Sequence, residues 1–162
     1  MGRAREPLVD AALQLIDEAF VKHAWHGPNL RGTIRGVTAA EAAWRPGPGR
    51  HSVWELVVHA AYWKYAVRRR LTGEKRGSFA YEGSNWFPRP DTGDEAAWKR
   101  DVRLLVEEHK KLRAVVASLR DRDLDRPASG HRTLARVLVR GIAAHDLYHA
   151  GQIQVVKRLR PE

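Results

Sequence analysis

Apolar residues recur every three or four positions along four long stretches of the chain, which predicts four amphipathic helices. The first runs from Pro7 to Ala24, and its proline suits a first helical turn. The second begins at a capping box, Ser52-Val-Trp-Glu55, and ends at Thr72-Gly73. The third carries its regular apolar positions between Trp98 and Leu119, and the fourth runs from about Thr133 to Leu159.

The connecting segments predict one short helix and one long loop. Thr38-Ala-Ala-Glu41 has the pattern of another capping box, and Arg45-Pro-Gly-Pro-Gly breaks the chain soon after it. Residues 73–93 are rich in Gly, Pro, Ser and Asn but also contain aromatic residues, which favours an ordered covering loop.

These elements predict an all-α protein with an up-and-down type four-helix bundle. A short extra helix precedes the second long helix, and a long irregular loop joins helices 2 and 3. At 162 residues the chain has a usual length for one domain, so we expect residues 1–162 to form a single bundle domain.

The net charge of the chain raises one further class of partner but does not change the predicted fold. The formal net charge of +10 arises from 29 basic and 19 acidic residues, which raises nucleic acid as a possible partner. However, the basic residues are scattered, and Arg68-Arg69-Arg70 is their only tight run. We therefore expect a solvated surface that attracts anionic small molecules, and nucleic-acid binding stays an alternative that rests on charge alone.

The chain has no cysteine, which excludes disulfides, thiolate ligands and a protein thiol nucleophile. Histidine and carboxylate groups remain as ligands for a transition metal. No secretory signal pattern and no run of about 18 apolar residues is present. We expect a cytoplasmic protein that does not insert into a membrane.

Three histidines occupy positions where apolar side chains are expected. His145 and His149 are four residues apart on the fourth helix, so both imidazoles can reach one cation. His59 interrupts the apolar stripe of the second helix and could supply a third ligand. Such a site suits Zn, Ni, Fe or Co, whereas the alternative is a set of core histidines satisfied by neighbouring carbonyl groups.

Residues near these histidines offer further candidates, each with a structural alternative. Glu55 lies one turn before His59 and could orient its ring, although the capping box already explains this glutamate. Gln152 could bond a metal-bound water or a substrate, or pair with a backbone group. Trp86 could line the mouth of a pocket, or anchor the loop by apolar contacts.

Other polar positions are expected to have less direct roles. His109 lies in the seam of the third helix and is interpreted as a satisfied core histidine. Asp146 and Tyr148 point away from the central stripe, which favours a place on the surface, at an interface or behind the ligands.

Three segments of the chain resemble the DinB-like (DinB/YfiT) superfamily of bacterial metal-binding four-helix bundles. They are Thr38–Pro46, His51-Ser-Val-Trp-Glu-Leu-Val-Val-His59 with Trp63 after it, and His145-Asp-Leu-Tyr-His149-Ala-Gly-Gln152-Ile. The resemblance spans nearly the whole chain and implies a four-helix bundle that forms a homodimer.

The resemblance also implies that His59, His145 and His149 are metal ligands, with Trp63 near the site. Characterised relatives include thiol-dependent transferases and isomerases that use low-molecular-weight thiols. We therefore expect a metal-dependent enzyme that activates water or such a thiol, as a thiol-dependent S-transferase or a hydrolase acting on a small-molecule substrate. The sequence identifies no catalytic residue beyond the ligands, so a non-catalytic, metal-stabilised binding or stress-response module is the alternative.

Overall fold

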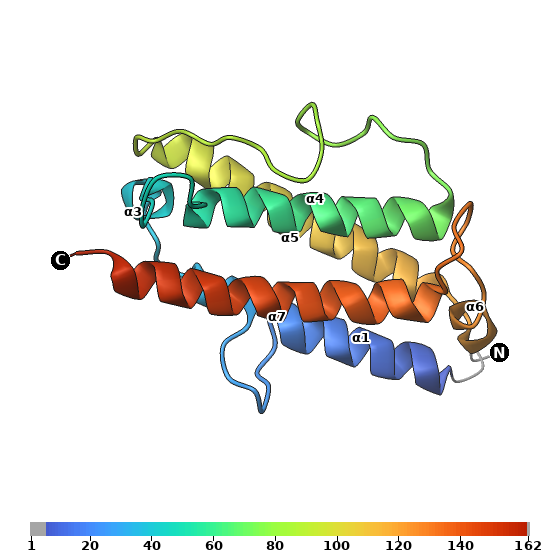
Figure 1. Cartoon of the computed structure of the whole chain (residues 1–162). Coiled ribbons are helices and arrows are strands. Elements are labelled where there is room, and N and C mark those ends of the chain that lie inside the picture. Colours follow the sequence, from blue (N-terminus) through green and yellow to red (C-terminus); the bar gives the residue numbers. More distant parts are fainter. Residues whose placement is uncertain (1–5, 162) are drawn as a thin grey trace.

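The computed structural model of the chain describes residues 6–161, which form an all-α bundle without strands, as predicted. Four long helices make the bundle: α1 (Pro7–Phe20), α4 (Val53–Thr72), α5 (Glu95–Ser118) and α7 (Ala135–Leu159) (Figure 1). Three short helices lie in the connections: α2 (Leu30–Thr33), α3 (Ala39–Ala43) and α6 (Asp121–Leu124).

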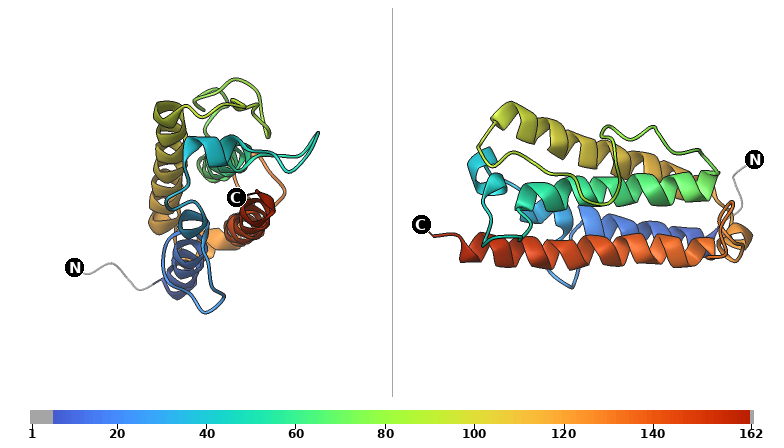
Figure 2. Two further views of the ribbon diagram at one scale, coloured as in Figure 1. Left: turned by 90° about the vertical axis from the view of Figure 1, so that its left-hand side faces the viewer. Right: turned by 45° about the horizontal axis from the view of Figure 1, so that its top comes forward.

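The long connection between α4 and α5 sets the direction of the helices. Residues 73–94 contain no helix and return along the length of the bundle, so α4 and α5 run in the same direction (Figures 1 and 2). Side-chain contacts agree, because Trp54 bonds Asp101 near the starts of these helices and Arg68 lies 3.6 Å from Glu108 further along. Helices α1 and α7 run the opposite way, so strict up-and-down alternation is absent between α4 and α5.

Both predicted capping boxes are present. Thr38 caps α3 with Glu41, and Ser52 caps α4 with Glu55, where each backbone N–H to side-chain bond in the second box is 3.2 Å long. Helix α4 ends at Thr72 and is capped by Gly73, whose φ of 77° is the left-handed conformation that glycine tolerates. These signals place the start of α4, and therefore the height of His59 in the bundle.

Helix α1 is shorter than predicted, because it ends at Phe20 rather than near residue 24. The Asp17 carbonyl accepts hydrogen bonds from the backbone N–H groups of Val21 at 2.9 Å and Lys22 at 2.8 Å, which closes the last turn. His23 and His26 therefore lie in the loop that follows the helix.

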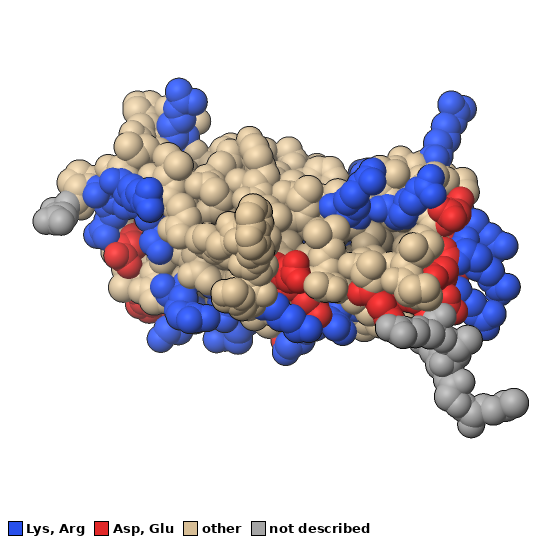
Figure 3. All heavy atoms as spheres, turned by 90° about the horizontal axis from the view of Figure 1, so that it is seen from below, with Lys and Arg blue, Asp and Glu red and all other residues tan. Residues whose placement is uncertain are grey.

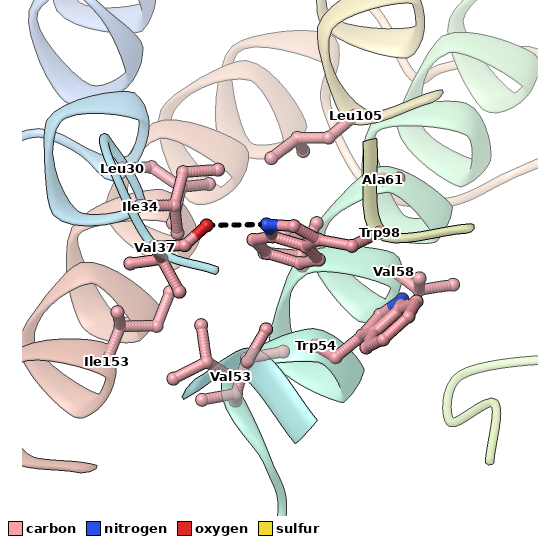
Figure 4. Packing of buried hydrophobic residues seen from close by; sticks show 14 of the residues in the cluster. Leu30, Ile34, Val37, Val53, Trp54, Val58, Ala61, Trp98, Leu105 and Ile153 are labelled. Carbon is pink, nitrogen blue, oxygen red and sulfur yellow. Dashed lines mark hydrogen bonds between the residues drawn. The ribbon is translucent and has the colours of Figure 1, made fainter. Parts of the chain in front are cut away.

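The hydrophobic core has two clusters. The first surrounds Trp54 and Trp98, whose rings meet edge to face at 5.5 Å. The Trp54 indole N–H donates to Asp101 at 2.6 Å. The Trp98 indole N–H donates to the Val37 carbonyl at 2.8 Å (Figure 4). The second cluster lies toward the start of α7 and includes Ile16, Leu112, Val116, Val139 and Ile142.

A layer of buried polar residues lies between the two clusters. Lys64 on α4, His109 on α5 and Asp146 on α7 are 0%, 5% and 1% exposed, and Lys64 and Asp146 form an ion pair. Along α5, for example, His109 lies between Leu105 of the first cluster and Leu112 of the second. Of the places considered for Asp146, the surface is excluded, because α7 packs against α1 as well as α4 and so buries a wide face.

We expect the buried His109 to make the protein less stable in acid. Burial lowers the pKa of His109 from 6.5 to about 3, and its ring stacks on Phe20 at 3.7 Å. Above pH 6.5, His109 is neutral in both the folded and the unfolded chain, so its contribution to the free energy of unfolding is complete. Below pH 6.5 the unfolded chain takes up a proton that the folded chain refuses, so the free energy of unfolding falls by up to about 1.4 kcal/mol per pH unit.

Urea unfolding of metal-free protein between pH 7.5 and pH 5 measures this dependence. The His109→Leu variant is expected to lose stability less steeply than the wild type as the pH falls. Identical slopes would show that His109 is not the source of the effect.

Candidate metal centre

Helices α4 and α7 bring His59, His145 and His149 together, and these three residues form a group that could hold one metal ion. The Nε2 atom of His145 lies 3.1 Å from Nε2 of His59 and 3.0 Å from Nε2 of His149. His145 and His149 share one face of α7 because they are one helical turn apart. His59 faces them from α4.

Hydrogen bonds at the other ring nitrogens show which atoms are free to bind a metal. His59 Nδ1 lies 2.7 Å from the Asn85 carbonyl oxygen, which can only accept, so Nδ1 carries the hydrogen. His149 Nδ1 likewise donates to Gln152 Oε1 at 2.6 Å. The Nε2 atoms of both rings therefore present lone pairs toward His145, in the tautomer that a metal ligand requires.

The donor set fits a transition metal better than it fits hydrogen bonding. His145 Nε2 carries at most one hydrogen, so it can donate to only one of its two neighbours. Three nitrogen ligands at about 2.1 Å from one ion lie about 3.0–3.4 Å apart, which matches the two separations of the Nε2 atoms. A single divalent ion would satisfy all three lone pairs.

The electrostatic surroundings keep the three rings neutral near pH 7. Burial lowers the pKa of His59 from 6.5 to about 4 and that of His145 to about 3, and burial also lowers the pKa of His149. Neutral imidazole is the form that binds a metal, so no proton has to leave these rings at neutral pH.

Trp86 holds His59 from the covering loop. Its indole ring lies between two imidazoles, stacked on His59 at a centroid distance of 3.8 Å and on His51 at 3.6 Å. Both faces of the indole are therefore occupied. Of the two roles considered for Trp86, the loop anchor is present, and the residue also lines the groove beside the histidines.

Trp63 acts on the site through Asn85. The Trp63 indole N–H donates to Asn85 Oδ1 at 2.9 Å, while the Asn85 backbone carbonyl accepts from His59. Asn85 has a φ of 68°, a left-handed conformation that asparagine adopts more readily than most residues. Sequence reasoning missed this asparagine, and the only available signal was its place beside Trp86 in the covering loop.

Gln152 and Glu55 have different partners from those considered first. Gln152 orients His149 and donates to Tyr148 Oη at 3.1 Å. Glu55 caps α4 and accepts from His51 Nδ1 at 3.1 Å, so it does not bond the ring of His59. Burial raises the pKa of Glu55, but hydrogen bonds from its neighbours outweigh this effect and lower the pKa below its usual value.

The remaining core histidine stays apart from this group. His109 stacks on Phe20 between α1 and α5 and is not one of the three residues of the metal-binding group. Its Nδ1 atom has no hydrogen-bond partner among the described residues, so the expected satisfied core histidine is buried but not fully paired.

A comparison with protein families assigns this chain to a known superfamily. The family model of the DinB superfamily matches residues 23–153, which include all three histidines and the covering loop. The chain belongs to the DinB superfamily. No curated protein and no solved structure shows a significant match to it.

In this member of the DinB superfamily, a groove of about 870 Å³ lies beside His149, one of the three histidines. His149 and Gln152 form part of its lining, and Leu56, Trp86 and Val155 supply apolar surface. Among the described residues that line it, Arg50 is the only Lys or Arg, and none is Asp or Glu. The groove can therefore take an apolar small molecule next to the metal-binding group.

Within residues 6–161, none of the helices has the length and apolar character needed to span a bilayer.

Proposed function

We propose that the protein binds one divalent transition metal ion through His59, His145 and His149 and is a metal-dependent enzyme acting on a small molecule in the adjacent groove. The observation that carries this proposal is the convergence of three imidazoles, in which Nε2 of His59 and Nε2 of His149 lie 3.1 and 3.0 Å from Nε2 of His145, while His149 lines the adjacent groove. An imidazole set favours Zn, Ni or Fe over Mg or Ca.

A three-histidine ion supplies Lewis acidity and open coordination positions that lower the pKa of water or a thiol. The protein's own residues do the positioning. Asn85 and Gln152 hold the rings of His59 and His149 in one tautomer, and Trp86 also fixes the plane of the His59 ring. The apolar wall of the groove excludes water from part of the bound substrate.

The absence of cysteine shapes the proposed reaction, because the protein has no thiol of its own. We propose that a low-molecular-weight thiol or water is the nucleophile, which makes the protein a thiol-dependent S-transferase or a hydrolase. Many small thiols carry carboxylates, and Arg50 is the cation that the groove offers to such an anion.

One observation favours a second candidate, a metal-stabilised binding or stress-response module without catalysis. The described lining of the groove contains no carboxylate that could act as a general base. This candidate predicts metal-dependent stability and ligand binding but no turnover.

A thiol-transfer screen separates the two candidates. The zinc-, nickel- and iron-loaded proteins are incubated with a small thiol and electrophilic substrates, and with ester and amide substrates for hydrolysis. Turnover by the metal-loaded wild type that disappears in His149→Ala supports the enzyme. Metal binding without turnover of any of these substrates supports the binding module.

Partners other than a small molecule remain proposals. A homodimer, which superfamily membership favours, would find exposed apolar side chains on α7, where Tyr148 and Val155 are 63% and 57% exposed. Nucleic acid is not favoured, because the face in Figure 3 intersperses Lys and Arg with Asp and Glu and has a largely uncharged centre. The mass of the protein in solution tests whether it forms a dimer. We also propose that the protein is located in the cytoplasm.

Removing the loop contact to His59 is expected to weaken metal binding. In Trp86→Ala, His59 loses the stacking partner that restricts its ring, so the metal dissociation constant should rise by about 10-fold to 100-fold. Competition with a chromophoric chelator measures this constant. The matched control is Trp25→Ala, since Trp25 is fully exposed, and an equal affinity of wild type and Trp86→Ala would contradict the role of the stack.

A further inference from the structure

Lys64 and Asp146 form the most deeply buried ion pair among the described residues. Lys64 Nζ lies 2.5 Å from Asp146 Oδ2, and the two side chains are 0% and 1% exposed. The pair joins α4 to α7, the two helices that carry all three histidines of the metal-binding group. Asp146 directly follows His145, and Lys64 lies five residues after His59.

Stability alone does not account for this pair. Moving two charges out of water costs several kcal/mol per ion, and apolar residues of similar size are often equally or more stabilising. Both sides of the layer are apolar clusters that would accept such residues. In addition, Asp146 Oδ1 and His109 Nδ1 have no hydrogen-bond partner among the described residues, so the layer is not arranged for the lowest energy.

An ion pair is directional, so it can fix the axial position of one helix relative to another, which apolar packing alone does less well. A slip of α7 by one helical turn would move its histidines by about 5.4 Å, more than the Nε2 separations within the group. The Lys64 ammonium also lies 4.7 Å from the centre of the Phe20 ring on α1, and Phe20 stacks on His109 of α5. All four long helices therefore meet at this level.

We propose that Lys64 and Asp146 are positioning residues of the metal centre, which set the register of α7 against α4 so that His145 and His149 face His59. This inference rests on the proposed metal binding. It assigns to the ion pair a function in metal affinity and coordination geometry that differs from its contribution to folding.

The double variant Lys64→Met with Asp146→Leu tests the inference, because it replaces the pair by apolar residues of similar volume. The metal-free variant should unfold at the same urea concentration as the wild type or a higher one. Its zinc dissociation constant should rise at least about 10-fold, and the visible absorption of its Co²⁺ form should shift. Fold stability alone would not move the Co²⁺ spectrum.

The matched control is the ion pair between Asp17 on α1 and Arg113 on α5, which are 2.6 Å apart and lie on helices without a metal-binding histidine. Asp17→Leu with Arg113→Met should bind zinc as the wild type does and keep its Co²⁺ spectrum. If this control shows the same loss of affinity, the effect is not specific to the α4–α7 pair and the inference is wrong.

A second variant covers the case in which the apolar double variant fails to fold. Asp146→Glu keeps both charges but lengthens one side chain by a methylene, which displaces α7 from α4. It should bind zinc more weakly and show a shifted Co²⁺ spectrum. Wild-type affinity and spectrum in a folded variant would overturn the inference, whereas a wild-type protein that takes up no metal would remove the proposed function and the inference with it.

Discussion

The His145→Ala variant is expected to lose metal affinity by at least about 1,000-fold, well beyond the 10-fold to 100-fold typical of residues that only orient a ligand. His145 Nε2 lies 3.1 and 3.0 Å from the other two Nε2 atoms, so its removal leaves two nitrogens from different helices. Titration of the metal-free protein with zinc against a competing chelator measures the loss.

The buried His109 offers a matched control for this substitution. His109→Leu also removes a core histidine, but one that lies outside the three-histidine group, so its zinc affinity should equal that of the wild type. If His109→Leu and His145→Ala weaken zinc binding equally, the loss reflects damage to the core and not removal of a ligand.

Metal loading is expected to raise the stability of the wild type by about 4 kcal/mol when free zinc exceeds its dissociation constant about 1,000-fold. For a chain of this length, this corresponds to a rise in Tm of roughly 8–16 °C. The reason is linkage, because the folded chain brings together three ligands that α4 and α7 hold only when packed. Thermal unfolding with zinc and with a chelator measures the difference.

The His149→Ala variant shows whether this stabilisation comes from the proposed site. Its Tm should be the same with zinc and with chelator, because only two of the three nitrogens remain. A variant that is still stabilised by zinc as strongly as the wild type would place the bound metal elsewhere. A sharp loss of stability in the variant under both conditions would indicate that His149 itself stabilises the fold.

Local sequence signals predicted the framework of the site well. The capping box at Ser52 set the start of α4, and helical periodicity put His145 and His149 on one inward face of α7. Such signals depend on residues within one or two helical turns of each other. They can therefore be read without knowing how distant parts of the chain pack.

Contacts between distant segments could not be predicted in this way. The carbonyl of Asn85 reaches His59 only because the covering loop returns along α4, and a loop of that length is compatible with either direction of α5. Lys64 and Asp146 were missed because a periodicity reading assigns charged residues to the surface, whereas each of them is buried by the other.

Metal analysis of untagged protein tests the central proposal most directly. Wild-type protein, His145→Ala and His149→Ala are purified without a histidine tag, incubated with Zn, Ni or Fe, desalted and measured by elemental mass spectrometry. The proposal predicts about one ion per chain in the wild type, as three converging imidazoles require, and almost none in either variant. A wild-type protein that retains none of the three metals would contradict it and leave the histidines as buried polar residues of the bundle.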